Sequence, residues 1–526
     1  MRLHDLLADL PNASIAGPTD VEISSLAYDS RAVRPGSLFV AIRGFHTDGH
    51  AYIPQALERG AAAVVYEERE LTPPGITSVR VPDSRTALAP LAAAFYGHPG
   101  REMRVVGVTG TDGKTTTTFL ISAVLEAGGY TTGLMGTVDF KVAGRQWAND
   151  TRQSTPEAPE VQALLREMVD SGCDYAVVEA TSHALSARWR RLDGCAFDVA
   201  VLTNVTHEHL DFHGSVEQYR RDKARLFEML GEESPLSVVS SQLQGAMGHG
   251  QRTMDNGQRT KQRKVAIANA DDPHHRMFLD TAPPGATRLT YAVNRPADVR
   301  AHDIVSTREG LRFRVTTPLG ETEMRLKLTG DFNVANALAA LTAGLAEGVP
   351  LDACVRALAA IPGVRGRMER IEMGQPFTVL VDYAHTPGAF EKLMGIIRPL
   401  TAGKLIAVFG SAGERDREKR PIQGEVAARF CDLLVLTDED PRLEDREAII
   451  AEIAAGAERA GKREGSGYLR IPDRPAAIRA AFARARPGDI VLLLGKGHEG
   501  CIFYGEGKIP WDEGGEARAA LREMGY

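Results

Sequence analysis

Arg104-Val-Val-Gly-Val-Thr109-Gly110-Thr-Asp-Gly113-Lys114-Thr115-Thr-Thr-Thr118 is the stretch that decides the fold of the chain around it. Its β-branched first half is typical of a buried strand, and the helical pattern that starts at Thr115 ends at two glycines, 128 and 129. Strand, glycine loop, Lys-Thr and helix form the layout that binds polyphosphate. Loop N–H groups and the positive helix end face the anion, the lysine reaches the outer phosphates, and a hydroxyl can bind Mg²⁺. We therefore predict a nucleotide site formed by Gly110, Thr111, Asp112, Gly113, Lys114, Thr115 and Thr116.

The loop is shorter than the usual G-x-x-x-x-G-K-[ST] motif, because Val108 occupies the position of the first glycine. A bare Gly-Lys-Thr is more often a plain turn before a helix. The buried strand before the loop and the helix after it are what favour nucleotide binding here.

Length and composition exclude several classes of protein. A chain of 526 residues is too long for one core and indicates about three domains. The net charge of −7 gives no basic footprint for nucleic acid, and no run approaches the roughly 18 apolar residues of a membrane span. The five cysteines are scattered and never in C-x-x-C spacing, and residues 1–10 lack a signal-peptide core. We expect a cytoplasmic protein without disulfides or a cysteine zinc site.

Polar loops flank the first predicted strand of the N-terminal region. Residues 37–42 and 61–66 have strand patterns, with a helix predicted at 53–59 between them. Tyr28-Asp-Ser-Arg31 precedes the first strand and Arg43-Gly-Phe-His-Thr-Asp-Gly49 follows it. Loops at both ends of one strand are suited to hold a ligand, although Asp-Ser and Asp-Gly are also common turn formers.

The central region collects oxygen and nitrogen ligands at predicted strand ends. Residues 175–179 form a strand that ends in Glu179, and the strand at 197–202 is followed by a polar segment with His209. Ligands gather beyond the carboxyl ends of parallel strands, so we expect both groups beside the phosphate loop. Thr115, Glu179 and His209 then form a plausible Mg²⁺ shell. His207-Glu-His209 is not H-E-x-x-H, and we interpret His207 and His213 as solvated, structural histidines.

Three further features of the central region can be explained without a functional role. Lys223 lies on a predicted helix over 218–229, where a charged residue by default faces solvent. Residues 232–264 lack periodicity and indicate a mobile insertion. Asn333 and Asn336 share one face of a predicted helix and could read an adenine edge or cap the helix.

The last third predicts a second doubly wound α/β unit. Apolar runs at 378–382, 405–409, 433–437 and 490–494 alternate with amphipathic helices, which indicates a mostly parallel sheet covered on both faces. Charged residues follow these strands and suit a zwitterionic small molecule: Arg415, Glu439, Asp440, Arg442 and Glu499.

Several motifs, in order, resemble the Mur ligases of peptidoglycan synthesis. They are G-T-D-G-K-T, S-T-P-E-A-P (154–159), T-S-H-A-L (181–185), N-V-T-H-E-H-L-D (204–211), G-D-F-N-V-A-N (330–336), G-R-M-E (366–369), D-Y-A-H-T-P (382–387) and G-K-G-H-E (495–499). Within that family the chain resembles the MurE type, which adds the third peptide residue to UDP-N-acetylmuramoyl-L-alanyl-D-glutamate. The resemblance runs from about Asp29 to Glu499, and only the 232–264 segment has no counterpart.

The resemblance implies an α/β protein of three domains. These are a small UDP-sugar-binding domain (1–102), a central P-loop domain that binds ATP (103–346) and a C-terminal Rossmann-like domain that binds the amino acid (347–526). It also implies catalytic roles for Lys114, Glu179, His209 and Lys223. Lys223 falls on the lysine that the family carries as a carbamate, which would make it an oxygen ligand of a second Mg²⁺. The implied metal ligands are thus Thr115, Glu179, His209 and carbamylated Lys223.

Binding roles follow from the resemblance in the same way. ATP contacts are implied for Asn333, Asn336, Arg367, Asp382 and His385 in addition to the phosphate loop. UDP-muramoyl-dipeptide contacts are implied for Ser30, Phe45, His46, Thr47, Ser154, Thr155 and Ser182, with either Arg188 or Arg190 as the arginine that follows S-H-A-L. Amino-acid contacts are implied for Arg415, Glu439, Asp440, Pro441, Arg442, Gly495 and Glu499.

The implied reaction uses ATP and Mg²⁺ and proceeds through an acyl phosphate. A D-glutamyl carboxylate attacks the γ-phosphoryl group, and the amine of a diamino acid then displaces phosphate. We expect a monomer with no nucleic-acid or membrane partner. Two alternatives are a folylpolyglutamate synthase, which leaves the 29–48 loops and G-K-G-H-E unexplained, and a non-catalytic nucleotide-binding regulator, which leaves Arg415, Arg442 and Glu499 unexplained.

The sequence departs from the family where the diamino acid is selected. Members specific for meso-diaminopimelate carry D-N-P-R, and this chain has Glu439-Asp440-Pro441-Arg442. An aspartate places a negative charge where the distal carboxylate would lie. Two like charges about 4 Å apart cost about 1 kcal/mol in water and about 4 kcal/mol at an effective dielectric constant near 20. We therefore expect L-ornithine or L-lysine, with meso-2,6-diaminopimelate as the alternative that Arg442 could still hold.

Overall fold

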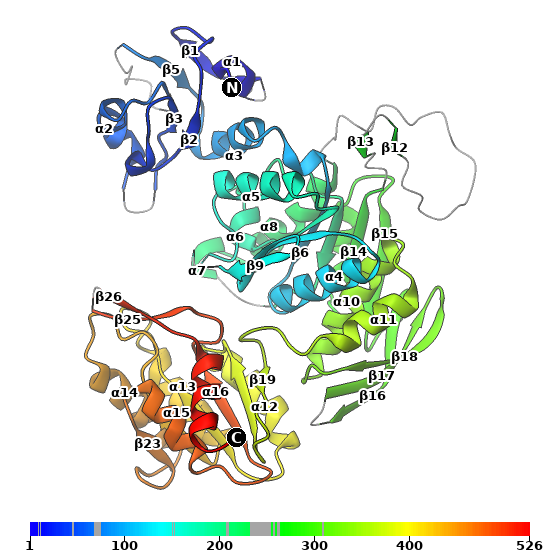
Figure 1. Ribbon diagram of the computed structural model, residues 1–526, viewed down its shortest axis with the longest axis vertical. Coiled ribbons are helices and arrows are strands. Elements are labelled where there is room, and N and C mark those ends of the chain that lie inside the picture. Colours follow the sequence, from blue (N-terminus) through cyan, green and yellow to red (C-terminus); the bar gives the residue numbers. More distant parts are fainter. Residues whose placement is uncertain are drawn as a thin grey trace. The chain divides into compact units, whose positions relative to one another are not determined.

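The computed structural model describes residues 1–526 except 9, 11, 45–46, 68–74, 150, 152, 207–209, 232–253, 256–257, 260–262, 308–309 and 506. The chain forms two compact units (Figure 1). The first comprises residues 1–147, 153–300 and 338–354, and the second comprises 148–152, 301–337 and 355–526. Phe45, His46, His207, His209 and most of the predicted 232–264 insertion lie outside the described residues.

A five-stranded sheet opens the first unit, in the order β1-β5-β4-β3-β2, and only its edge strand β1 is antiparallel. Neighbouring residues of β3 alternate between two cores: Leu38 packs with Leu88 of α3, whereas Phe39 packs with Ile53 of α2. Helices therefore cover both faces, as the predicted strand–helix–strand pattern requires. The elements are α1 (Leu3–Leu7), β1 (Ser14–Ala16), β2 (Ser25–Ala27), β3 (Ser37–Val40), α2 (Ile53–Glu58), β4 (Ala63–Tyr66), β5 (Thr77–Arg80) and α3 (Ser84–Phe95).

The larger sheet of this unit has the order β15-β14-β11-β6-β10-β7-β8-β9, parallel from β15 to β7. Val108 of β6 lies opposite Glu179 of β10, and Thr109 lies opposite Leu202 of β11. The three strands thus end side by side, as predicted. The elements are β6 (Arg104–Thr109), α4 (Lys114–Ala127), β7 (Thr132–Met135), β8 (Asp139–Val142), β9 (Arg145–Ala148), α5 (Ala158–Asp170), β10 (Tyr175–Glu179), α6 (Ser182–Leu185), β11 (Val199–Leu202), α7 (Leu210–His213), α8 (Val216–Glu228), β12 (Met254–Asp255), β13 (Gln258–Arg259), β14 (Val265–Asn269), α9 (His275–Thr281) and β15 (Thr287–Ala292).

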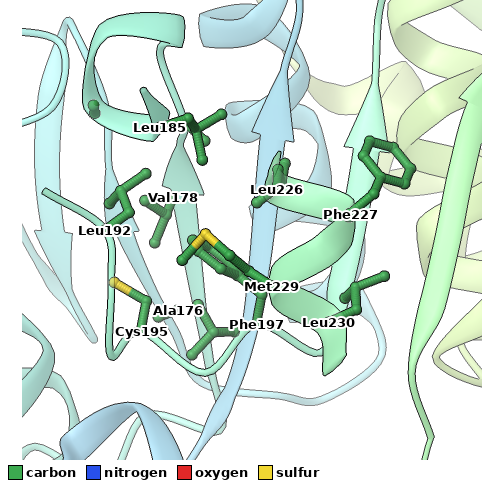
Figure 2. Packing of buried hydrophobic residues seen from close by; sticks show 14 of the residues in the cluster. Ala176, Val178, Leu185, Leu192, Cys195, Phe197, Leu226, Phe227, Met229 and Leu230 are labelled. Carbon is green, nitrogen blue, oxygen red and sulfur yellow. The ribbon is translucent and has the colours of Figure 1, made fainter. Parts of the chain in front are cut away.

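Helix α8 is fixed to this sheet by its apolar side chains. Leu226 and Phe227 are fully buried and belong to the same core as Phe197, just before β11, and Val178 of β10 (Figure 2). Burying a large apolar side chain contributes roughly 1.5–3 kcal/mol, so this face determines how α8 lies. As a consequence, Asp222 and Lys223, one turn earlier on α8, lie near the strand ends.

The opposite ends of β6 and β10 are joined through one carboxylate. Glu347, just after α10 (Phe332–Ala346), accepts from Arg104 Nε at 2.6 Å and from Arg104 Nη2 at 2.8 Å. It also accepts from the Tyr175 hydroxyl at 2.8 Å. Arg104 and Tyr175 lie opposite each other at the first pair of the two strands. Glu347 therefore binds both strands where they start.

The second unit contains a doubly wound sheet, β19-β20-β24-β21-β22-β23, parallel except for β19. Successive residues of β21 alternate between two cores: Ala407 packs with Phe390 of α12, whereas Ile406 packs with Ile478 of α15. This confirms the predicted two-sided sheet (Figure 1). The elements are β16 (Val299–Thr307), β17 (Gly310–Thr317), β18 (Gly320–Leu326), α11 (Leu351–Ala360), β19 (Glu369–Ile371), β20 (Thr378–Asp382), α12 (Pro387–Ile397), β21 (Leu405–Phe409), α13 (Lys419–Phe430), β22 (Leu433–Leu436), α14 (Arg446–Arg459), β23 (Tyr468–Arg470), α15 (Arg474–Phe482), β24 (Ile490–Leu494), β25 (Cys501–Tyr504), β26 (Gly507–Pro510) and α16 (Glu513–Glu523).

In the part of the chain that the structure describes, no helix combines the length and the apolarity that crossing a membrane needs.

Candidate functional site

The phosphate loop depends on two glycines. Gly110 has φ +152°, and a Cβ there would lie 1.8 Å from Oγ1 of Thr203. Gly113 has φ +84° and precedes α4 directly. A side chain is excluded by contact at the first position and disfavoured by backbone conformation at the second. The loop therefore turns tightly and leads straight into the N-terminus of α4.

The segment after β11 holds the loop in place. Thr111 N–H donates to the Asn204 carbonyl at 2.7 Å, and Asp112 N–H donates to the Asn204 side-chain oxygen at 3.1 Å. The Thr203 hydroxyl donates to the Asp112 carbonyl at 2.7 Å. These bonds join the segment after β11 to the loop after β6 and fix the loop conformation.

Two lysines converge on one loop carbonyl. Lys114 Nζ donates to the carbonyls of Gly110 (3.1 Å) and Thr111 (2.9 Å). Lys223 Nζ donates to the same Gly110 oxygen at 2.6 Å and lies 4.5 Å from the centre of the Tyr219 ring. Lys223 is 1% exposed, so the default expectation of a solvated face for this residue is wrong. Its carbamylation stays a prediction.

Glu179 and Thr115 form an oxygen-rich group beside the loop. Thr115 Oγ1 lies 3.1 Å from both carboxylate oxygens of Glu179, and Thr137 N–H donates to Oε2 at 2.9 Å. A hydroxyl and a carboxylate side by side are the hard oxygen donors that Mg²⁺ takes. The two described members of the predicted shell therefore fit Mg²⁺. Among the described residues no cluster of three His, Cys, Asp or Glu side chains adds to them, and His209 is not among those residues.

The residues predicted to hold the muramoyl-dipeptide are distributed over the first unit. The Thr155 hydroxyl donates to the Glu179 carbonyl at 2.8 Å, which places the Ser154–Thr155 segment at the same strand end. Ser182, the first residue of α6, is also buried there. Ser30 is buried in the N-terminal sheet region and donates to Gln55 at 2.7 Å, whereas Thr47 is exposed.

The arginine after S-H-A-L has a third candidate that the sequence did not single out. Arg188 is exposed, and Arg190 Nε forms an ion pair with Asp193 at 2.7 Å. Arg191 instead contacts the Ser154–Thr155 segment: its Nη1 donates to the Thr155 carbonyl at 3.1 Å, and its Nη2 pairs with Glu157 at 2.7 Å. Residues 188–191 contain three arginines, and the sequence did not show which one contacts the Ser154–Thr155 segment. The conformation of this loop decides that.

His213 is not the solvated histidine that was expected. Its side chain is 0% exposed, and Nδ1 lies 2.6 Å from Oδ2 of Asp222 on α8. Its Nε2 lies 3.1 Å from Oγ of Ser182. Burial lowers the pKa of His213, partly opposed by the Asp222 carboxylate. The expectation failed because the apolar packing of α8 brings this helix against α6 and α7.

The predicted nucleotide contacts of the second unit form two groups. Asn333 donates to the Thr329 carbonyl at 2.7 Å, and Asn336 donates to Asn333 Oδ1 at 2.9 Å, so both amides take part in the first turn of α10. Both carboxylate oxygens of Asp382 accept backbone N–H groups, from Met368 and Ala384, at 2.8 Å.

An aromatic residue links the other members of this set. Tyr383 packs against His385 and His498, with ring centres 4.7 and 4.8 Å apart respectively. The Arg367 guanidinium lies 5.1 Å from the centre of the same Tyr383 ring. Asp382 begins the D-Y-A-H-T-P motif that places these residues, so the predicted Arg367, Asp382 and His385 lie in one local group.

The predicted amino-acid ligands lie around the ends of β22 and β24. Asp440 is 4% exposed, accepts from Lys496 Nζ at 2.9 Å and accepts from Phe503 N–H at 3.1 Å. Lys496 is completely buried and also pairs with Glu499 Oε2 at 2.5 Å. The negative charge of Asp440 is therefore paired with a buried ammonium, which Asp440 shares with Glu499, whereas the sequence predicted an aspartate that faces the substrate with its charge.

The other predicted ligands differ in exposure. Glu439 is buried against Gly495, where a Cβ would lie 3.0 Å from Glu439 Oε2. Pro441 is buried, and Arg415 is exposed. Arg442 has φ +56°, and its guanidinium lies 5.6 Å from the centre of the Phe503 ring. These residues come to one end of the sheet, as their positions after strands predict.

Three family models match the chain in order. They are the Mur ligase family catalytic domain (residues 22–96), the Mur ligase middle domain (108–247 and 256–344) and the Mur ligase glutamate ligase domain (366–497). A UDP-N-acetylmuramyl-tripeptide synthetase of Roseiflexus sp. (strain RS-1) is 70% identical over 529 residues, which cover 100% of both chains. The chain belongs to the Mur ligase family.

Other comparisons place this Mur ligase with the MurE type. A UDP-N-acetylmuramoyl-L-alanyl-D-glutamate--2,6-diaminopimelate ligase of Geobacter metallireducens is 40% identical over 100% of this chain and 99% of its own. A solved structure with the same name aligns with 100% of this chain and 99% of its own, at 28% identity and a TM-score of 0.67. The predicted α/β fold, the MurE resemblance and the ATP-dependent ligase class are thereby confirmed.

Proposed function

We propose that this Mur ligase joins a diamino acid to UDP-N-acetylmuramoyl-L-alanyl-D-glutamate and converts ATP to ADP and phosphate. The observation that carries the proposal is the group around Gly110, where Lys114, Lys223, Thr115 and Glu179 meet at the ends of β6 and β10. A phosphate loop with the Lys114 ammonium beside it, and with the Thr115 and Glu179 oxygens available to Mg²⁺, suits transfer of a phosphoryl group between anions. We propose a cytoplasmic monomer of three domains, 1–102, 103–346 and 347–526.

In this reaction the D-glutamyl carboxylate oxygen attacks the γ-phosphorus and ADP leaves. The diamino acid's amine then attacks the acyl carbon, loses a proton and displaces phosphate. Lys114 and the N-terminus of α4 would offset the repulsion between the two anions in the first step. Mg²⁺, when held by Thr115, Glu179 and His209, with Lys223 as a carbamate for a second ion, would supply further positive charge to the phosphates.

The remaining predicted residues supply binding. Asn333, Asn336, Arg367, Asp382 and His385 would contact the nucleotide, and the loops that contain Ser30 and residues 45–47 would hold the UDP-sugar. Ser154, Thr155 and Ser182 would hold the peptide, with the arginine supplied by Arg188, Arg190 or Arg191. Support for Arg191 comes from its hydrogen bond to the Thr155 carbonyl at 3.1 Å.

For the diamino acid we propose L-ornithine or L-lysine. The support is the hydrogen-bonding chemistry of Asp440 rather than its charge, since that charge is paired with Lys496. An ionised carboxylate only accepts hydrogen bonds, whereas the asparagine of D-N-P-R can donate to a distal carboxylate. Asp440 therefore offers no hydrogen-bond donor to a second carboxylate on the substrate. A distal ammonium, which needs acceptors, is not disfavoured in this way. The alternative, meso-2,6-diaminopimelate, is favoured by the names of relatives near 40% identity and by Arg442.

The test is phosphate release from ATP in the presence of the UDP-muramoyl-dipeptide and one amino acid at a time. The proposal expects release that needs both the dipeptide and a diamino acid, with a higher kcat/KM for ornithine or lysine. Preference for meso-diaminopimelate would overturn the choice of amino acid but not the ligase reaction. No dipeptide-dependent release with any of the three would overturn the reaction itself.

A further inference from the structure

Four side chains, of which Gln218 is half-buried and the other three are buried, form a chain of hydrogen bonds behind the strand ends. Gln218 Nε2 donates to Asp222 Oδ1 at 2.9 Å, Asp222 Oδ2 lies 2.6 Å from His213 Nδ1, and His213 Nε2 lies 3.1 Å from Ser182 Oγ. Asp222 and Gln218 are on α8, His213 ends α7 and Ser182 starts α6. Both short helices pack against α8 (Figure 1).

The direction of each bond in this chain follows from the inventory of donors and acceptors. A carboxylate only accepts, so the ring nitrogen that faces Asp222 carries a proton. Burial lowers the pKa of His213, although the Asp222 carboxylate opposes this shift, so the ring is neutral at neutral pH. A neutral ring with a proton on Nδ1 has a lone pair on Nε2. The Ser182 hydroxyl must then donate its proton to Nε2.

The rings around His213 restrict its movement. The ring centre of Tyr219 lies 5.0 Å away, that of Phe212 4.7 Å away and that of His183 5.3 Å away. A ring flip would place a carbon where Asp222 now accepts and would break the 2.6 Å contact. The histidine is thus held in one orientation by packing and by its carboxylate partner.

We propose that His213, oriented by Asp222, is a positioning residue that fixes the Ser182 hydroxyl as a hydrogen-bond acceptor toward the peptide part of the substrate. With its proton bound to Nε2, Ser182 Oγ presents lone pairs to a ligand. It would therefore accept from an amide N–H of the muramoyl-dipeptide and would not donate to a carboxylate. This inference rests on the proposed function for the identity of the ligand, and on the structure alone for the proton positions.

The first test measures the proton positions in the ligand-free, full-length protein. NMR of protein labelled with ¹⁵N-histidine reports which ring nitrogen is protonated, and His213→Gln identifies the resonance. The inference expects a neutral ring with the proton on Nδ1 in the wild type. In Asp222→Asn, an isosteric amide that can donate to Nδ1, the proton should move to Nε2. A wild-type ring protonated on Nε2 overturns the inference whatever the enzymatic activity.

The second test is a double-mutant cycle on the KM for the UDP-muramoyl-dipeptide. Ser182→Ala should raise this KM about five- to tenfold, the usual worth of a neutral hydrogen bond, without changing the KM for ATP. Asp222→Asn should raise it by a similar factor, because the tautomer change turns Ser182 from acceptor to donor. If Asp222 acts through Ser182, adding Asp222→Asn to Ser182→Ala changes the KM no further. Multiplicative effects in the double variant overturn the inference.

The outcomes separate this inference from the proposed function. Dipeptide-dependent phosphate release by the wild type is measured first and reports on the reaction. The NMR result does not depend on that activity. A wild type that is active, with an Asp222→Asn variant whose KM for the dipeptide is unchanged, overturns the role of the His213–Asp222 pair and leaves the ligase reaction standing.

Discussion

Lys496 Nζ lies 2.9 Å from Asp440 Oδ1, and both residues are buried, Asp440 after β22 and Lys496 after β24. Lys496 also pairs with Glu499, so one ammonium is shared by two carboxylates. A buried ion pair is more costly to break than it is stabilising when formed. Any substitution in this group therefore affects the partner as well as the residue itself.

Asp440→Asn should shift substrate selectivity toward meso-diaminopimelate. The amide keeps an acceptor for Lys496 and gains N–H groups that can donate to a distal carboxylate. We expect the ratio of kcat/KM for meso-diaminopimelate over ornithine or lysine to rise about tenfold or more, as one hydrogen bond to a charged group is worth roughly 1.5–3 kcal/mol. Asp445→Asn, at the N-cap of α14, is the control. An unchanged ratio would mean that Asp440 does not face the amino acid.

Lys114→Ala should lower kcat by about 10²–10³-fold without unfolding the protein. The residue is half-buried at the phosphate loop, and electrostatic groups of this kind contribute roughly 3–4 kcal/mol in the transition state. Steady-state phosphate release and the thermal unfolding midpoint check the two parts of the prediction. Lys508→Ala, on the exposed strand β26, should leave kcat unchanged. Near-normal turnover of Lys114→Ala would contradict the assigned role.

Lys223→Ala should be nearly inactive and partly rescued by short carboxylates such as formate or acetate. The buried cavity left beside Gly110 can admit a small anion, which would replace the oxygen atoms of a carbamate. Lys223→Arg keeps the positive charge but cannot form the carbamate, so rescue should be absent there. A high-resolution structure of the active enzyme shows whether Lys223 carries the carbamate. An unmodified Lys223 in an active enzyme would refute the prediction.

Stability of the second unit should fall as the pH is lowered below about 6.5 because of His498. Burial, together with the neighbouring Arg367, Arg365 and Lys496, lowers the pKa of His498 to about 3. Between pH 6.5 and 3 the unfolded chain binds a proton at this histidine and the folded chain does not. The free energy of unfolding therefore decreases with acidification, by at most about 1.4 kcal/mol per pH unit from this group.

The measurement for His498 is the thermal unfolding midpoint from pH 7.5 to 5. His498→Gln should flatten this dependence, whereas His4→Gln, at an exposed histidine, should retain it. Equal pH dependence in wild type and His498→Gln would show that another group causes the loss of stability.

Much of the fold could be predicted because its signals are local. The β-branched run before Gly110 and the apolar runs of the last third became strands β6, β20, β21, β22 and β24. The position of Glu179 beside the phosphate loop also followed from strand order, since parallel strands end together. These predictions needed only residue periodicity and the geometry of parallel sheets.

The predictions that the structure overturned concern residues whose contacts are far apart in the sequence. Asp440 and Lys496 are 56 residues apart, and the pairing depends on β22 and β24 both ending at the same edge of the sheet. The burial of His213 depends on the apolar face of α8, which lies several residues beyond it. A single charged or polar residue carries no periodic signal, so its burial could not be predicted before the packing of its helix was known.

Glu347 affects the distance between the phosphate loop after β6 and Glu179 at the end of β10. It binds Arg104 and Tyr175 at the start of β6 and β10, and the same strands end at the phosphate loop and at Glu179. A shift of one strand by a single residue would displace Glu179 by about 3.3 Å and point its side chain to the opposite face. Glu347, a full strand length away, thus fixes the register of β6 against β10. The distance between the phosphate loop and Glu179 is therefore set at the end of the sheet opposite the reaction.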